Sequence, residues 1–193
     1  MVARARRRQG GTAVKIVVTG PFAAGKTTLI RTISEITVLS TEKAVSAGEV
    51  AQSKTDTTVA MDFGRITIDR DLVLYLFGTP GQDRFDFMWE ILSEGMLGYI
   101  LLVDAARPDS LEEAASILGA FRAMAHVPFV IGYNRADGLD DNDEGRMRGV
   151  LDLEQDVPIV PCDVTDRESV KAVLLAMLYA VVDSLDTATA AQA

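Results

Sequence analysis

The sequence predicts a single-domain α/β protein with a mostly parallel sheet that is covered by helices on both faces. Short apolar runs alternate with amphipathic stretches along most of the 193 residues. These runs are rich in β-branched residues and show no polar alternation, which is typical of strands buried on both faces. No repeat, linker or composition break divides residues 12–185, a length that suits one hydrophobic core. Residues 1–11 and 186–193 are expected to be flexible tails.

The first half of the chain predicts three strands. The run KIVVT at Lys15–Thr19 is an apolar, β-branched strand, and a helix is expected directly after it at Lys26–Ile36. Residues 37–57 are polar without periodicity, so they predict a long loop, and such loops are commonly functional. Strands at Thr58–Asp69 and Leu72–Phe77 flank a charged turn and form a hairpin, which gives the sheet one antiparallel strand.

The second half alternates helix and strand, so it extends the sheet to six strands in total. Strands are expected at Gly98–Asp104, Val127–Tyr133 and Val157–Pro161, and helices near residues 88–96, 109–124, 142–152 and 166–185. In the first of these helices, the apolar cluster Met88, Trp89, Ile91 and Leu92 is expected to pack on the sheet. Ligands of such sheets bind at the carboxyl ends of the strands, so the site residues are expected there.

Composition and charge exclude several classes of function. The formal net charge of −9 and the pI near 4.6 oppose nucleic acid or an anionic membrane as the main partner. One cysteine, Cys162, and one histidine, His126, supply neither a disulfide nor a Cys- or His-based metal site, which fits the cytoplasm. The N-terminal arginines precede glycines rather than an apolar stretch, no apolar run reaches membrane-spanning length, and no lipidation motif is found. We therefore expect no signal peptide and no stable membrane anchor.

A glycine-rich segment follows the first predicted strand. Residues 20–27 read GPFAAGKT and match the phosphate-binding pattern G-x-x-x-x-G-K-[ST]. Gly20 lets the backbone turn and approach a phosphate, Lys26 brings a positive charge, and the Thr27 hydroxyl can ligate Mg²⁺. Backbone N–H groups at the start of the helix can bind phosphate oxygens. We expect them from Ala23, Ala24, Gly25, Lys26, Thr27 and Thr28. The segment predicts a nucleoside triphosphate site with Mg²⁺.

A second motif, Asn134-Arg135-Ala136-Asp137, follows the strand at Val127–Tyr133. The Asp137 carboxylate can accept hydrogen bonds from the N1–H and 2-amino groups of guanine, and adenine offers neither donor in that arrangement. Arg135 can lay its aliphatic stem or guanidinium group on the base. The motif therefore predicts guanine as the base.

Together these motifs resemble those of small Ras-like GTPases over roughly residues 14–182, which implies the Ras-like P-loop fold. Residues 57–64 resemble switch I, and the resemblance makes Thr58 a ligand of Mg²⁺. Residues 77–85 resemble switch II, where Gly81 would donate its N–H to the γ-phosphate and Gln82 would orient the attacking water. Near the base, Cys162 and Asp163 would act through backbone contacts, although the match there is poor.

The sequence Thr-Pro-Gly-Gln at residues 79–82 is similar to the prokaryotic members, the MglA-like and Roadblock-associated group. This resemblance implies a molecular switch that cycles between GTP and GDP through GTPase activity. It also implies regulators of the Roadblock type or other effectors as partners.

Three positions depart from the family pattern. Gly78 replaces the aspartate that usually opens switch II, and Asp62, on the neighbouring strand, is a candidate substitute that would hold Mg²⁺ through water. The equally weighted alternative is that Asp62 faces solvent or caps a partner. Phe22 is bulky where the family has a small residue, so we expect slow hydrolysis. Pro80 fixes φ before the Gly-Gln pair and stiffens that loop.

Two other functions stay open. A P-loop nucleoside or small-molecule kinase would need an acceptor pocket and a basic lid, yet the loop at 37–57 has only Lys43 and Lys54 as basic residues. A nucleotide-binding scaffold with negligible hydrolysis is compatible with Phe22 and Gly78.

Overall fold

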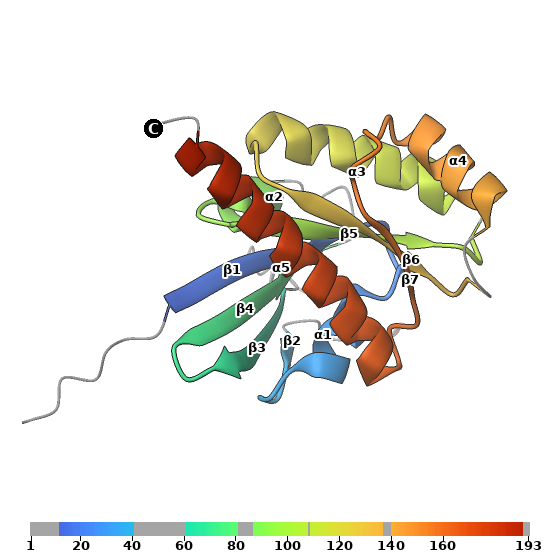
Figure 1. Cartoon of the computed structure of the whole chain (residues 1–193). Helices are drawn as coiled ribbons and strands as arrows, with labels where there is room; N and C mark the ends of the chain where they lie inside the picture. The colour runs from blue at the N-terminus through green and yellow to red at the C-terminus, as the bar shows by residue number, and fades with distance from the viewer. Residues whose placement is uncertain (1–11, 41–60, 81–86, 108, 137–139, 191–193) are drawn as a thin grey trace, which may run out of the picture.

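The computed structural model describes residues 12–40, 61–80, 87–107, 109–136 and 140–190 (Figure 1). The strands are β1 (Thr12–Thr19), β2 (Leu39–Ser40), β3 (Asp62–Asp69), β4 (Leu72–Gly78), β5 (Gly98–Asp104), β6 (Phe129–Asn134) and β7 (Ile159–Cys162). The helices are α1 (Lys26–Ile33), α2 (Phe87–Ser93), α3 (Ser110–Met124), α4 (Asp141–Val150) and α5 (Arg167–Ala190).

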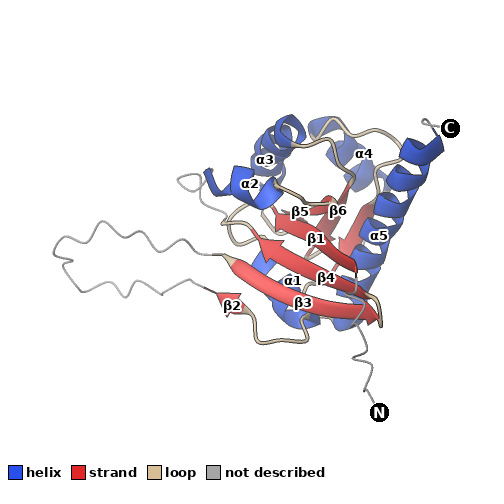
Figure 2. Ribbon diagram, turned by 90° about the vertical axis from the view of Figure 1, so that its left-hand side faces the viewer, coloured by secondary structure: helices blue, strands red, loops and turns tan. Residues whose placement is uncertain are grey.

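The predicted α/β fold is confirmed, with one addition to the sheet. The strand order within the described residues is β2-β3-β4-β1-β5-β6-β7. Six strands match the predicted ones, and the two-residue β2 adds a seventh beside β3. Strands β1, β4, β5, β6 and β7 pair in parallel, whereas β3 is antiparallel to β4, as the hairpin predicts. Helices α1 and α5 cover one face, and α2, α3 and α4 the other (Figure 2).

Several predicted boundaries were wrong by a few residues. Helix α1 ends at Ile33 rather than Ile36, because Ser34 takes an extended backbone with ψ of 138°. Strand β1 begins three residues early, at Thr12, because its pairing with β4 reaches back to Leu72. Helix α5 continues to Ala190, so residues 186–190 belong to a helix rather than to the expected tail. Residues 1–11 lie outside the described residues.

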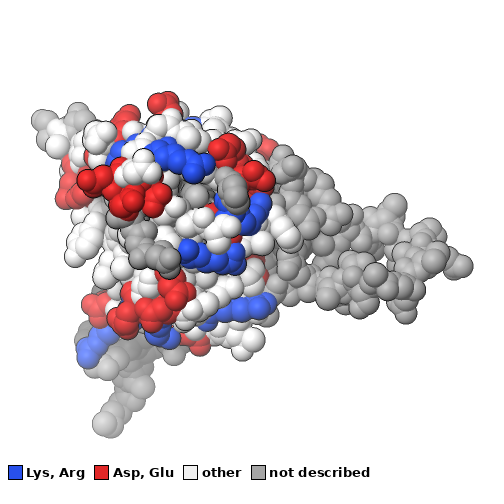
Figure 3. Space-filling model, turned by 90° about the vertical axis from the view of Figure 1, so that its right-hand side faces the viewer, with Lys and Arg blue, Asp and Glu red and all other residues white. Residues whose placement is uncertain are grey.

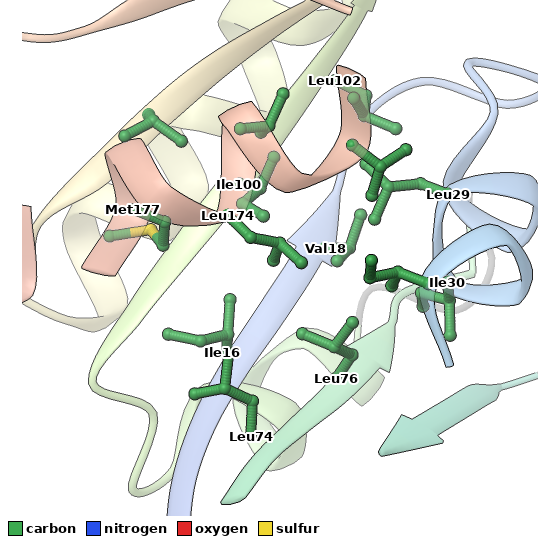
Figure 4. Packing of buried hydrophobic residues seen from close by; sticks show 14 of the residues in the cluster. Ile16, Val18, Leu29, Ile30, Leu74, Leu76, Ile100, Leu102, Leu174 and Met177 are labelled. Atoms are coloured by element: carbon green, nitrogen blue, oxygen red, sulfur yellow. The ribbon is translucent and has the colours of Figure 1, made fainter. Parts of the chain in front are cut away.

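Alternation along the central strands divides the core into two layers. Ile16 and Val18 of β1 face α1 and α5, whereas Val17 faces the opposite layer. Ile100 and Leu102 of β5 join the first layer, where they meet residues of α1 and α5 such as Leu29 and Met177 (Figure 4). The second layer holds Trp89 and Leu92 of α2, as the predicted apolar cluster requires, but Ile91 is 59% exposed. Burial on both faces holds the strands rigidly and fixes their carboxyl ends.

Helix α5 differs from the expectation that no apolar run reaches membrane-spanning length. Its 24 residues include an 18-residue window of mean hydropathy 1.5, which is long and apolar enough to cross a membrane by length and composition alone. One face of the helix nevertheless packs into the first core layer. A core helix of a soluble α/β protein passes the same test, so this is weak support for a membrane span.

Candidate nucleotide site

The glycine-rich loop connects the buried end of β1 to the start of α1. Gly20 has φ of 138°, and a Cβ there would collide with the carbonyl oxygen of Leu102 on the adjacent β5. Gly25 has φ of 107°, and a Cβ there would lie 2.9 Å from Asn134 Nδ2. Both positions combine left-handed backbone with close neighbours, so only glycine fits without strain. The loop thus has the local structure that the sequence predicts.

Side chains hold every carbonyl oxygen from Gly20 to Ala24. Lys26 Nζ donates to Gly20 O and Pro21 O at 2.7 Å each. Arg107 Nη1 donates to Phe22 O, Arg135 Nη2 to Ala23 O at 3.4 Å, and Asn134 Nδ2 to Ala24 O at 2.9 Å. A loop restrained at five successive carbonyls is ordered before a ligand arrives, which lowers the entropic cost of binding.

Three of these donors are cations, and two of them, Arg107 and Arg135, are also paired with carboxylates. Arg107 is oriented by Glu113 of α3, whose Oε1 lies 2.7 Å from its Nη2. On the end of the molecule where the parallel strands finish, Lys and Arg side chains lie between separate groups of Asp and Glu (Figure 3). Cations at the loop are groups that an anionic ligand can contact.

Asp62 lies directly beside the end of the glycine-rich loop, at Thr27. Thr27 Oγ1 donates a hydrogen bond to Asp62 Oδ2, which joins α1 to the first residue of β3. Asp62 is only 8% exposed, and no donor among the described residues reaches its Oδ1. A buried carboxylate oxygen without a partner is costly, and such groups commonly await a cation or an ordered water. The alternative that Asp62 faces solvent is wrong, whereas the bond from Thr27 Oγ1 fits the alternative that Asp62 caps a partner.

The absence of an aspartate at position 78 has a steric explanation. Gly78 pairs with Asp62 across β3 and β4. A Cβ on Gly78 would lie 2.9 Å from Ile30 Cδ1 and 3.1 Å from Asp62 Cβ. Asp62 and Ile30 therefore already fill the space that a side chain at 78 would need. One carboxylate therefore lies here, and it belongs to Asp62 of β3 instead of to a residue of β4.

The ends of β5 and β6 are joined to the glycine-rich loop. Asn134 is 1% exposed, and its Oδ1 accepts from Val164 N at 3.3 Å while its amide holds Ala24 O. Arg135 Nη1 lies 2.5 Å from Asp104 Oδ2, and the Asp104 side chain is fully buried. Arg135 and Ala23 both have left-handed backbones, with φ of 59° and 61°. Strained backbone of this kind is common at functional sites.

Arg135 is thus tied to Asp104 and Ala23, so its guanidinium group has partners other than a base. Asp137, the residue expected to select guanine, lies outside the described residues. Arg107 and Asp104 were missed at the sequence level. Asp104 ends a buried parallel strand, as Asn134 does, and this shared position was the available signal because such strand ends meet at one edge.

The residues expected near the base through β7 are engaged within the chain. Asp163 N donates to Ser169 Oγ at 2.8 Å, and hydrogen bonds from Thr165 lower the pKa of the Asp163 carboxyl. Burial raises the pKa of the Cys162 thiol to about 11, so this thiol is protonated at neutral pH. Asp163 N could contact a base only after its bond to Ser169 is broken. The expected role of Cys162 and Asp163 near the base stays a prediction.

The predicted switch residues fall mostly outside the described parts of the chain. Thr58, Gly81 and Gln82 are among them, so the structure does not locate them. The residues just before Gly81 are held in place: Thr79 N donates to Val18 O at 3.0 Å, and Trp89 Nε1 to Pro80 O at 3.5 Å. Thr79 and Pro80, which follow β4, are therefore held next to β1 and α2.

Comparison with known proteins decides the family. The family model described as "Conserved hypothetical ATP binding protein" matches residues 18–184, which includes the glycine-rich loop and all the site elements above. The chain belongs to this ATP-binding family. An uncharacterized protein of Methanocaldococcus jannaschii is 32% identical over 124 residues, covering 64% of this chain and 71% of that protein. Family membership and the loop geometry together make this a nucleotide-binding protein.

The family match corrects one prediction. The resemblance to MglA-like, Roadblock-associated Ras-like GTPases was wrong, because the chain is a member of a different P-loop family. Much of that resemblance lies in the glycine-rich loop. The residues of this loop are those that phosphate binding requires, and many P-loop families share them. The four residues at 79–82 are too few to separate the families. The Roadblock-type regulator depended on this resemblance and loses its support.

Proposed function

We propose that this member of the ATP-binding family binds a guanine nucleoside triphosphate with Mg²⁺ and hydrolyses it slowly as a GTP/GDP switch. The observation that carries the proposal is the joint geometry of the glycine-rich loop and Asp62. The loop offers a restrained anion site at the start of α1. Asp62 Oδ1, beside Thr27 and without a partner in the part of the chain that the structure describes, offers a site for a metal-bound water. Together they fit a phosphate chain that carries a divalent cation.

The residues present fit Mg²⁺. This ion usually takes one or two protein oxygen ligands, substrate phosphates and several waters. Thr27 Oγ1 would bind the ion directly, Asp62 Oδ1 would hold one of its waters, and Thr58 would be the further ligand from the loop before β3. Bound there, Mg²⁺ would neutralise negative charge on the outer phosphates. Lys26, which now donates to Gly20 O and Pro21 O, would turn its ammonium group to the same phosphates.

The choice of guanine rests on Asn134 and Asp137. Asn134 is held between the glycine-rich loop and Val164, so the segment that follows it starts at the edge of the nucleotide site. Asp137, three residues later, would accept from the N1–H and 2-amino groups of guanine. The family description names ATP, so base choice is the part of this proposal that most needs measurement.

Base choice can be tested by titrating the parent with GTP, ATP and xanthosine triphosphate. We expect the parent to prefer GTP over ATP by at least about a hundredfold, because unpaired buried groups penalise the wrong base. In Asp137→Asn, the amide can donate to the 2-oxo group of xanthine, so the preference should move from GTP to xanthosine triphosphate. Equal or tighter binding of ATP by the parent would contradict guanine selection and leave the triphosphate site intact.

The residues around the expected position of the γ-phosphate are the reason that we propose slow hydrolysis of GTP. Phe22 is 55% exposed on the loop, where its ring crowds the approach of a catalytic group from another protein. Gln82 would orient the attacking water and Gly81 would donate its N–H to the γ-phosphate. In single-turnover assays we expect slow release of phosphate from GTP, a further loss of about tenfold or more in Gln82→Ala, and a gain in Phe22→Gly. If neither substitution changes the rate, the protein is a nucleotide-binding scaffold rather than a switch.

The proposed setting is the cytoplasm, where GTP and Mg²⁺ are supplied. Partners would be proteins that distinguish the GTP-bound from the GDP-bound state of the loops around Thr58 and Gln82. Exposed Phe87 and Ile91 of α2, at 56% and 59%, lie one helical turn apart directly after the second of these loops. They are the apolar contact that such an effector would use.

A further inference from the structure

Helix α5 carries apolar side chains on two opposite faces. One face packs into the core through Val170, Val173, Leu174, Met177 and Val181. On the solvent side, Leu175, Tyr179 and Val182 are 53%, 68% and 51% exposed. A helix that covers a sheet is expected to be polar on its outer face, and clustered apolar exposure marks an interaction surface. The spacing of 175, 179 and 182 places these three side chains in one stripe.

The stripe stands between two hollows in the surface. On one side is a groove of about 690 Å³ between α5 and the segments that lead into β6 and β7, and Tyr179 lines it. On the other side, a smaller hollow of about 270 Å³ lies between α5 and β3, and Leu175 lines it. Small residues of α5, Ala176 and Ala180, line the larger groove. A ridge with grooves beside it is the shape into which a second helix packs.

Charges at the two ends of the stripe are of opposite sign. Lys171 lies one turn before Leu175, and Asp186 lies one turn after Val182, and both are exposed. If two copies of α5 align antiparallel, Lys171 faces Asp186 of the other copy and Leu175 faces Val182 of the other copy. Both pairings share one midpoint, beside Tyr179. Lys171 also contacts Glu168 in its own chain at 2.6 Å, an exposed pair that contributes little to stability.

We propose that the outer face of α5 is a self-association surface, on which two copies of this chain pair their α5 helices antiparallel around a two-fold axis near Tyr179. A symmetric pair needs a self-complementary patch, and the stripe satisfies this in both apolar contact and charge. A membrane fits the surface less well, since Asp183 and Asp186 lie along its carboxyl half and the chain carries a net charge of −9. The surface is distinct from the nucleotide site and does not depend on the function proposed above.

The first test measures the mass of the full chain in solution by sedimentation equilibrium over a range of concentrations. We expect a monomer–dimer equilibrium based on the 20.8 kDa chain. Val182→Glu should give a monomer at all concentrations, because it places a charge in the apolar stripe. The matched control is Val150→Glu on α4, where Val150 is also exposed, at 39%, and this variant should dimerise like the parent. Circular dichroism checks that both variants are folded.

The second test uses charge reversal. Lys171→Glu and Asp186→Lys should each weaken dimerisation by about four- to twenty-fivefold, since two symmetry-related ion pairs are lost and each changes the equilibrium by about two- to fivefold. The double variant should restore most of the parent affinity, because the reversed charges attract again. A helix that merely needs these residues for folding would not show this recovery.

Three results would overturn the proposal. The first is that the parent stays monomeric at high concentration. The second is that Val182→Glu dimerises as well as the parent. The third is that the double charge reversal weakens dimerisation by the sum of the two single effects instead of restoring it. Flotation with phosphatidylcholine vesicles, with and without phosphatidylserine, tests the other occupant. Binding of the parent to these vesicles that Val182→Glu abolishes would assign the stripe to a lipid surface.

Discussion

At the residue scale, Gly78 and Asp62 show how one side chain can take the place of another across a strand pair. Asp62 Oδ2 accepts from Thr27 Oγ1, and the Gly78 backbone approaches Asp62 closely enough to leave no room for a second side chain. The carboxylate that accompanies the glycine-rich loop therefore depends on glycine at 78 as much as on aspartate at 62.

This dependence predicts that Gly78→Ala destabilises the protein. The added Cβ must displace Ile30, which is fully buried, or Asp62, and overpacking of this kind costs about 1–3 kcal/mol. Gly119→Ala in α3 is the matched control, because nothing lies within 4 Å of its Cβ position. That change should stabilise by about 0.5–1 kcal/mol, since alanine is the better helix former. Urea unfolding measures both, and a stable Gly78→Ala variant would contradict the close packing described here.

Arg107 is the second residue whose role is local. It links Phe22 O to Glu113 at the rim of the glycine-rich loop. Arg107→Ala should weaken triphosphate binding by about three- to tenfold, because the loop loses one restraining hydrogen bond, and a typical bond of this kind is worth about 0.5–1.5 kcal/mol.

Arg146→Ala serves as the control for Arg107, because Arg146 is likewise paired with a glutamate of α3, Glu112, at 3.8 Å. Its removal should leave nucleotide affinity unchanged. Titration calorimetry with the Mg²⁺ complex of a non-hydrolysable GTP analogue measures both variants. Equal affinities for the two would mean that the Arg107 contact does not organise the loop.

At the element scale, the site is an assembly of strand ends. The loop after β1, the end of β6 and the segment after β7 meet at Asn134, which bonds to Ala24 O and Val164 N. Parallel pairing of β5, β6 and β7 brings these ends to one edge of the sheet. Asn134 therefore acts as a joint between elements as well as a neighbour of the nucleotide.

This joint predicts a combined loss in Asn134→Ala. Removing the amide leaves Ala24 O and Val164 N without this partner in a buried place, which lowers the free energy of unfolding by about 1–3 kcal/mol. Triphosphate affinity should fall as well, because the loop loses one of its restraints. Asn134→Asp keeps the acceptor for Val164 N but sets a buried carboxylate oxygen against Ala24 O, so it should lose at least as much stability as Asn134→Ala. It should also lose more affinity, since it adds a negative charge beside the phosphates. Parent-like stability in Asn134→Ala would refute the joint.

At the scale of the whole molecule, the sequence predicted the α/β layers because each buried strand is a continuous apolar run. Boundaries were less predictable: α1 stops at Ile33 where Ser34 turns extended, and α5 continues through residues with no stop signal before Ala190. Strand β2 was missed, since two residues carry no periodicity.

The candidate site was predictable where a motif is local and unpredictable where contacts are long-range. The glycine-rich loop lies within eight residues, so its pattern is visible in the sequence. Arg107 and Glu113 approach that loop only through the fold. Family assignment failed for a related reason, because phosphate-binding residues reflect the ligand more than the lineage.

The most direct test of the central claim is the Mg²⁺ dependence of triphosphate binding in the parent and in Asp62→Asn. The substitution keeps an acceptor for Thr27 Oγ1 and nearly the same shape, so it removes the charge alone. Asp69→Asn, at the exposed far end of β3, is the control. With Mg²⁺, titration with a non-hydrolysable GTP analogue should show about 10- to 100-fold weaker binding for Asp62→Asn than for the parent or Asp69→Asn. With EDTA, all three should bind alike. Unchanged affinity of Asp62→Asn in Mg²⁺ would contradict the account.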